Sequence, residues 1–162
     1  MEGCCTQGPG ALRSTCPECG RPGRPVDRVT LEALLRPEAL ARLEAGDHRF
    51  CPTAECPSVY FGPGDSFRRE DVLVPVFQKQ LEGDGRTVCY CFDVAEATIR
   101  REVVTSGDSA SADRIRALVQ SGRCACEVRN PQGTCCLGNV AMVVASARAW
   151  RESAPAPSLR AT

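Results

Sequence analysis

The chain has 162 residues, of which 5% are aromatic and 12 are cysteine, and its 20 basic and 20 acidic residues cancel to a formal net charge of zero. Such a chain lacks the basic excess that holds a phosphate backbone, so we expect no nucleic acid as a partner. We also expect no membrane span and no secretion signal, because no stretch is long and apolar enough. We therefore predict a cytoplasmic protein. In that compartment paired cysteines are more often metal ligands than disulfides; the alternative is a secreted protein with a disulfide scaffold.

The first half of the chain predicts one helix and several short strands. Residues 31–44 carry leucines at helical spacing, with Thr30 as the expected N-cap and Pro37 as an interruption. The segments predicted to be strands are 48–51, 58–61 and 72–77.

Two cysteine pairs in this half have the spacing of structural zinc ligands. Cys16 and Cys19 are separated by two residues, and Gly20 can adopt the positive φ that such a tight turn often needs. Cys51 and Cys56 are separated by four residues. Four thiolates form a closed tetrahedral site with no open position, so the pattern favours a structural Zn²⁺ site over a catalytic one.

The second half predicts three helices. The first begins at a capping pair formed by Asp93 and Glu96, and the second opens at Ser111 and closes at Gly122. The third begins at Leu137, which is followed by apolar residues at helical spacing.

This half also contains a C-x-C pair, Cys89 and Cys91. C-x-C is unusual for zinc but suits one iron of a two-iron cluster, although tetrahedral sulfur coordination by itself permits either metal. An oxidised [2Fe-2S] centre with four thiolates carries a charge of about −2. Cys91 and Cys136 each precede a predicted helix, whose N-terminal N–H groups would stabilise such an anion. The other cysteines of this half are Cys124, Cys126 and Cys135.

The motifs VCYCF at 88–92 and CEVRNPQGTCC at 126–136 resemble the iron–sulfur domain of CopZ-type copper metallochaperones, which is related to the BFD-like [2Fe-2S] ferredoxins. The first half is similar to the same family through CPEC at 16–19 and the cysteines that follow Phe50. The resemblance covers about residues 14–148 and is specific, because the order and spacing of eight cysteines agree with the family pattern.

The resemblance implies the ligands of both metals. Those of Zn²⁺ would be Cys16, Cys19, Cys51 and Cys56, and those of the [2Fe-2S] cluster Cys89, Cys91, Cys126 and Cys136. Spacing alone leaves Cys124 and Cys135 open as replacements, and the preference for Cys136 over Cys135 rests on the family pattern.

Copper binding is where the sequence departs from the family. Full metallochaperones of this type also carry a ferredoxin-like copper domain with a Met-x-Cys-x-x-Cys loop, which we expect this chain to lack, because Met142 is not followed by such cysteines. Cys4 and Cys5 are a candidate pair for capture of a soft ion such as Cu⁺. The alternative is an exposed thiol pair with no dedicated role.

These patterns predict an α+β fold with a small zinc-binding β-hairpin/helix domain followed by a small all-α BFD-like domain. Domains of this size have thin cores, and metal sites would serve as staples. The predicted divisions are a disordered arm at 1–14, the zinc-binding domain at 15–78, a linker at 79–86, the [2Fe-2S]-binding domain at 87–150 and a disordered tail at 151–162.

We predict a non-enzymatic, metallochaperone-like protein that acts as a one-electron redox accessory in copper or heavy-metal handling, with a redox partner or a metal-transport protein. The alternatives are a ferredoxin-like electron carrier for another oxidoreductase and a structural zinc/iron–sulfur adaptor or regulator. No catalytic constellation is evident, because His48 is the only histidine and nothing places it beside a nucleophile. His48 could replace one zinc thiolate, but we interpret it as an exposed strand residue.

Overall fold

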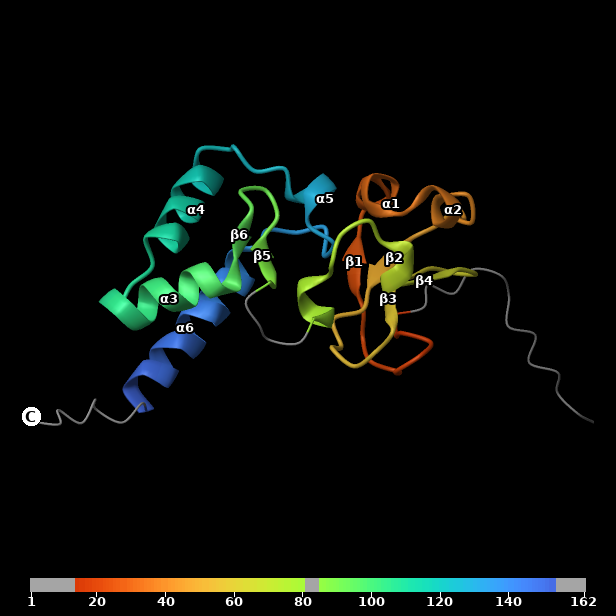
Figure 1. Cartoon of the computed structure of the whole chain (residues 1–162). Helices are drawn as coiled ribbons and strands as arrows, with labels where there is room; N and C mark the ends of the chain where they lie inside the picture. The colour runs from red at the N-terminus through yellow and green to blue at the C-terminus, as the bar shows by residue number, and fades with distance from the viewer. Residues whose placement is uncertain (1–13, 81–84, 154–162) are drawn as a thin grey trace, which may run out of the picture. The chain divides into compact units, whose positions relative to one another are not determined.

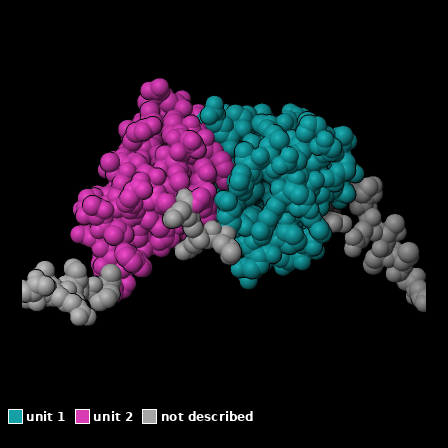
Figure 2. All heavy atoms as spheres, in the orientation of Figure 1, with its two compact units in different colours: residues 1–81, 125–135 teal, residues 82–124, 136–162 magenta. Residues whose placement is uncertain are grey.

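The computed structural model describes residues 14–80 and 85–153 (Figure 1). The chain divides into two compact units, shown in Figure 2: unit 1 comprises residues 1–81 and 125–135, and unit 2 comprises residues 82–124 and 136–162. The sequence analysis placed residues 125–135 in the second domain, whereas in the structure they are part of unit 1.

Unit 1 is built on a four-stranded antiparallel sheet with the order β1–β2–β3–β4. Its strands are β1 (Arg24–Val26), β2 (His48–Phe50), β3 (Ser58–Phe61) and β4 (Ser66–Arg68). Strands β2 and β3 confirm two of the predicted strands. The sequence analysis does not predict strands β1 and β4, each of which has three residues.

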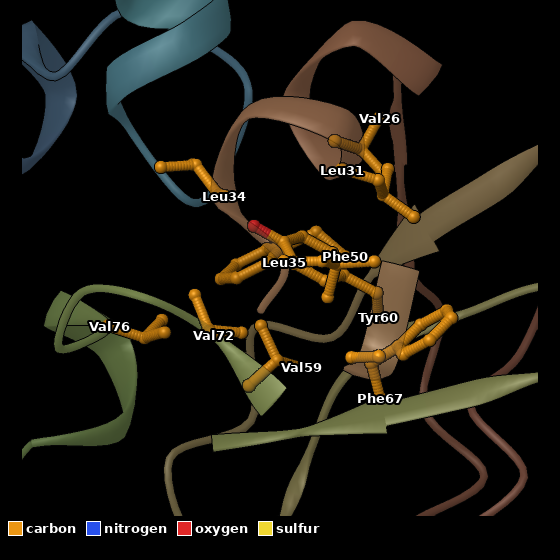
Figure 3. Packing of buried hydrophobic residues seen from close by; sticks show 11 residues of the cluster. Val26, Leu31, Leu34, Leu35, Phe50, Val59, Tyr60, Phe67, Val72 and Val76 are labelled. Carbon is orange, nitrogen blue, oxygen red and sulfur yellow. The ribbon is translucent and has the colours of Figure 1, made fainter. Parts of the chain in front are cut away.

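The main core of unit 1 lies between this sheet and helix α1 (Arg28–Leu34) (Figure 3). Leu31 and Leu34 from the helix pack with aromatic side chains of the sheet, and the rings of Phe50 and Tyr60 lie 6.1 Å apart between centroids. Burial of each such side chain contributes about 1.5–3 kcal/mol. Few but large buried groups therefore give this small unit its hydrophobic stability.

Two details of the predicted first helix are wrong. Thr30 is not its cap: α1 begins at Arg28, and Thr30 is buried inside the helix. Pro37 is more than an interruption, because it is the first residue of a separate helix, α2 (Pro37–Leu40). Proline favours this position, where its missing N–H has no intrahelical partner to lose.

The predicted strand at 72–77 is also wrong. Val72 forms only an isolated bridge with Leu35, and Leu73 N–H donates to Leu34 O at 2.8 Å. Val72 and Val76 are buried in the core, and Val74 packs against it. The chain then forms the 3₁₀ helix η2 (Phe77–Lys79). A second 3₁₀ helix, η1 (Arg69–Asp71), precedes this segment.

Residues 125–135 are held in unit 1 by side chains of the zinc-binding half. This segment contains the one-turn helix α5 (Cys126–Arg129). The Thr30 hydroxyl donates to Glu127 O at 2.6 Å, and the buried Tyr60 hydroxyl donates to Pro131 O at 2.7 Å. Both carbonyls gain partners that the loop itself does not supply.

Unit 2 combines three helices with a β-hairpin. The prediction of an all-α domain is therefore wrong, because it did not include this hairpin. The hairpin is β5 (Thr87–Cys89) and β6 (Val94–Ala95), and the helices are α3 (Glu96–Ser106), α4 (Ala110–Gln120) and α6 (Leu137–Ser153). Ile99 and Val103 of α3, Ile115 of α4 and Val143 of α6 are buried. The predicted disordered tail is wrong for residues 151–153, which continue α6, and its remainder lies outside the described residues.

The predicted capping pair does not form either. Asp93 has a positive φ of 51°, and Glu96 is fully buried, where it pairs with Arg86 and with Arg100. Arginine at both sides compensates the charge of a carboxylate that has lost its water. The second helix begins one residue earlier than predicted, with Ser109 as N-cap accepting from Ala112 N–H at 3.0 Å. No helix of the described residues is long and apolar enough to cross a membrane.

The attachment of residues 125–135 to α1 gives a prediction at Gly133. Its φ is +68°, and an added Cβ would lie 2.9 Å from Val26 Cγ2 and 3.0 Å from Thr30 Oγ1. Gly122 has nearly the same φ, +70°, with nothing within 4 Å of the added atom. Gly122→Ala should therefore lower the free energy of unfolding by about 1–2 kcal/mol, and Gly133→Ala by about 2–4 kcal/mol.

Denaturant unfolding followed by circular dichroism measures both effects. Equal losses in the two variants would show that the segment does not pack against α1 as described.

Candidate metal centres

The four cysteines predicted to bind zinc converge in unit 1. Their sulfur atoms all lie within 4.8 Å of one another, with 3.8 Å between Cys16 Sγ and Cys56 Sγ and 3.8 Å between Cys19 Sγ and Cys51 Sγ. Four sulfurs bound tetrahedrally to zinc at about 2.3 Å have S···S edges of about 3.8 Å. Among the described residues, this is the one group of three or more His, Cys, Asp and Glu side chains placed to share a single ion. The donor set and its spacing fit Zn²⁺.

Tight turns position the two pairs. Between Cys16 and Cys19 the chain closes with Gly20 N–H donating to Cys16 O at 2.8 Å, and Gly20 has a φ of +69°. Cys51 directly follows β2, and its N–H donates to Val59 O at 2.8 Å. The sulfurs also receive backbone N–H groups two residues further along the chain, from Arg21 to Cys19, from Thr53 to Cys51 and from Ser58 to Cys56. This is how zinc-knuckle turns stabilise thiolates.

The first turn is tied to the sheet by charge. Glu18, inside the Cys16–Cys19 turn, accepts from Arg68 Nη2 of β4 at 2.8 Å. The second loop is held by Arg69 Nη2, which donates to Ala54 O at 2.9 Å. Both cysteine turns are therefore fixed by arginines from one short segment of the chain.

Burial sets the acidity of the thiols. It raises the pKa of Cys51 and raises that of Cys56 to about 12, because a thiolate loses its hydration in the interior. Cys19 is half-buried, and a hydrogen bond with the Thr53 hydroxyl lowers its pKa to about 6. The environments of Cys51 and Cys56 thus disfavour the thiolate form, which a nearby cation would stabilise, whereas that of Cys19 favours it.

The only histidine is not exposed, contrary to the interpretation of the sequence. His48 is buried in β2, with Nδ1 3.0 Å from Gly46 O and Nε2 2.8 Å from Asp65 Oδ1. Both ring nitrogens face oxygen acceptors, so in this arrangement neither is available to replace a zinc thiolate.

The cysteines of the second set differ in burial. Cys89 and Cys136 are buried in unit 2, where their thiols hydrogen-bond to each other. That contact, together with N–H groups of Phe92 and Cys91, lowers the pKa of Cys89 to about 7. Cys91 is half-buried in the turn of the β5–β6 hairpin. A thiol pair with backbone N–H donors is an environment that favours thiolate ligands.

The remaining cysteines fall elsewhere. Cys126 is buried in unit 1, Cys124 is half-buried in unit 2, and Cys135 is exposed. The structure pairs Cys136, and not its neighbour Cys135, with Cys89. Cys4 and Cys5 lie outside the described residues.

One part of the expected cluster environment is wrong. Cys91 does not directly precede a helix, because the hairpin strand β6 intervenes and α3 begins at Glu96. Cys136 does directly precede the 17-residue helix α6. The N–H groups that reach Cys89 come instead from the hairpin turn itself.

Sequence reasoning missed two side chains of the zinc-site surroundings. The Thr53 hydroxyl hydrogen-bonds with Cys19 Sγ. Lys79, in η2, donates from Nζ to backbone carbonyls of the loop between Cys51 and Cys56. Lys79 was assigned to the linker, but it is buried in unit 1. A single lysine next to an acid- and glycine-rich stretch carries no signal of burial.

The first half of the chain is similar to a known zinc-binding family. Residues 13–73 match the CopZ-type family described as a zinc binding domain. All four converging cysteines lie inside this range. The four-sulfur centre therefore lies within the segment that matches this zinc-binding family, and its donor set fits Zn²⁺.

The similarity extends beyond that domain. The chain is 29% identical over 122 residues to the copper chaperone CopZ of Archaeoglobus fulgidus, which covers 75% of this chain and 57% of the relative. It also resembles the X-ray structure of the A. fulgidus CopZ N-terminal domain, with 28% identity, a TM-score of 0.64 and coverage of 80% of this chain and 96% of that domain. The chain thus spans little more than half of the full-length relative and nearly all of its solved N-terminal domain.

The zinc centre gives a direct prediction. Cys16→Ser should reduce bound zinc from one ion per chain to none, measured by elemental analysis, and should unfold unit 1 at a lower denaturant concentration. Structural zinc of this type supplies binding free energy on the order of 10 kcal/mol, which becomes folding free energy. Cys124→Ser, which changes a half-buried cysteine outside the site, is the control and should keep its zinc. Full zinc content in Cys16→Ser would contradict the assignment.

Proposed function

We propose that this protein is a zinc- and iron–sulfur-binding, metallochaperone-like protein that serves as a one-electron redox accessory in copper or heavy-metal handling. The observation that carries the proposal is the similarity to the copper chaperone CopZ of A. fulgidus, combined with eight cysteines in the order of a zinc site followed by a cluster site. The cytoplasmic location stays a prediction.

In this proposal the zinc half is structural. Four thiolates leave no open coordination position for a substrate, and three of the four sulfurs are buried. The centre instead links the turn at Cys16 and Cys19 to the loop at Cys51 and Cys56, between which there are few apolar contacts. Its role is to keep unit 1 folded, including residues 125–135 that Thr30 and Tyr60 hold.

The proposed cluster ligands are Cys89, Cys91, Cys126 and Cys136. Support comes from the contact between the Cys89 and Cys136 thiols and from the N–H groups directed at Cys89. A two-iron cluster divides its four thiolates between two irons, so it does not require four sulfurs around one point. When bound, a [2Fe-2S] cluster supplies a one-electron couple.

The chain's residues would shield this couple while leaving it accessible. In unit 2, Cys89 and Cys136 are buried, which keeps water from their sulfurs, whereas Cys91 is half-buried in the hairpin turn. A redox partner would donate one electron through the side of the site at Cys91, and a metal ion or a metal-transport protein would accept one electron. The alternative, a ferredoxin-like carrier for another oxidoreductase, uses the same residues without copper.

Anaerobic purification with ample iron tests the cluster. Wild-type protein should be red-brown, with about two irons and one zinc per chain. Cys89→Ser should lose the visible absorption and the EPR signal of the reduced protein while keeping zinc. Cys135→Ser, the exposed neighbour of a proposed ligand, should retain both, which also decides between Cys135 and Cys136. A colourless, iron-free wild-type protein would leave only the structural adaptor or regulator.

A Cu⁺ titration separates the two redox functions. For metal handling we expect sub-micromolar binding that is lost in a Cys4→Ser/Cys5→Ser double variant, because paired thiolates are preferred Cu⁺ ligands. A competition assay with a chromogenic Cu⁺ chelator measures it, and Cys124→Ser serves as the control. Absence of Cu⁺ binding by the wild-type chain would favour the electron carrier.

A further inference from the structure

Lys79 is the only lysine of the chain, and the structure buries it. Only 4% of its surface is exposed, at the end of the 3₁₀ helix η2 in unit 1. A lysine ammonium is strongly hydrated, and removing it from water costs free energy unless hydrogen bonds and negative charge replace the water. The surroundings of Lys79 should therefore contain both.

Its hydrogen bonds go to the loop that bears the second zinc pair. Lys79 Nζ donates to Thr53 O at 2.6 Å and to Cys56 O at 3.1 Å. The ammonium thus joins two carbonyls of the Cys51–Cys56 loop, one of them on a predicted ligand. Thr53 also carries the hydroxyl that meets Cys19 Sγ.

The negative charge is not supplied by a carboxylate. In the parts of the chain that the structure describes, each acidic ion-pair partner belongs to an arginine or to His48, and Lys79 has none. Two neutral carbonyls satisfy hydrogen bonds but do not balance a charge.

The four thiolates of the zinc site can supply this negative charge. Zn²⁺ with four thiolates has a net charge of about −2 by simple counting, and three of its sulfurs are buried in the same unit as Lys79. The geometry also links the two, because the carbonyl that Lys79 Nζ reaches at 3.1 Å belongs to Cys56, whose sulfur is one of the four. Each buried charge therefore compensates the other.

We propose that Lys79 is the charge partner and positioning residue of the zinc centre, and that its ammonium slows the release of the metal. This inference rests on the zinc assignment made above. It goes beyond the zinc ligands, because it assigns control of metal retention to a residue that binds no metal.

The test uses full-length chains with Lys79→Met, Lys79→Gln and Lys79→Arg. Methionine removes both the charge and the donors, glutamine keeps donors without charge, and arginine keeps the charge. Arg36→Gln removes one exposed charge from the same unit and is the matched control. The readouts are zinc per chain, the rate of zinc transfer to a chromogenic chelator, and the sulfur-to-cobalt charge-transfer spectrum of the Co²⁺-substituted protein.

We expect Lys79→Met and Lys79→Gln to release zinc about 10- to 100-fold faster than the wild type, the range seen when groups supporting metal ligands are removed. Their Co²⁺ charge-transfer bands should move to longer wavelength, since thiolates without a nearby cation give up electron density more easily. Lys79→Arg should stay close to the wild type in both readouts, and Arg36→Gln should not change. If Lys79→Met fails to fold, the glutamine and arginine variants decide the question.

Two outcomes would overturn the proposal. Wild-type release rates and spectra in Lys79→Gln would show that the charge has no role, while leaving the zinc assignment intact. A wild-type chain that binds neither Zn²⁺ nor Co²⁺ would remove the zinc assignment together with this inference.

Discussion

The close approach of four cysteine sulfurs is the constraint on which unit 1 depends. Within 4.8 Å of one another, these sulfurs can become anions together only with a cation among them. The thiol acidities show the same requirement, because burial raises the pKa of Cys51 and of Cys56. A divalent ion reverses this cost and turns two separate turns into one rigid centre.

The rest of unit 1 is arranged around that centre. Its hydrophobic core is small and depends on a few aromatic and leucine side chains between the sheet and α1. Arginines and the buried lysine fix the loops that the core does not reach. The same unit holds residues 125–135, with Cys126 in them, through the hydroxyls of Thr30 and Tyr60. The stability of the zinc half and the position of a proposed cluster ligand are thus physically connected.

This connection bears on the proposed function. A cluster that exchanges electrons needs ligands whose positions do not change with its charge, and rigid surroundings provide them. The four-sulfur centre of unit 1 stabilises the unit that holds residues 125–135, and with them Cys126.

Local sequence patterns predict which four cysteines converge in unit 1, the strands β2 and β3, and the approximate extent of the helices in unit 2. These features follow from local spacing: chelating pairs, alternating apolar residues and helical periodicity. Tertiary contacts, in contrast, place residues 125–135 in unit 1, pair Thr30 with a distant carbonyl instead of the start of α1, and bury His48, Glu96 and Lys79. Most of these depend on partners far along the chain, such as Asp65 for His48 and Thr53 for Lys79, and a local pattern of residues carries no information about contacts over such separations.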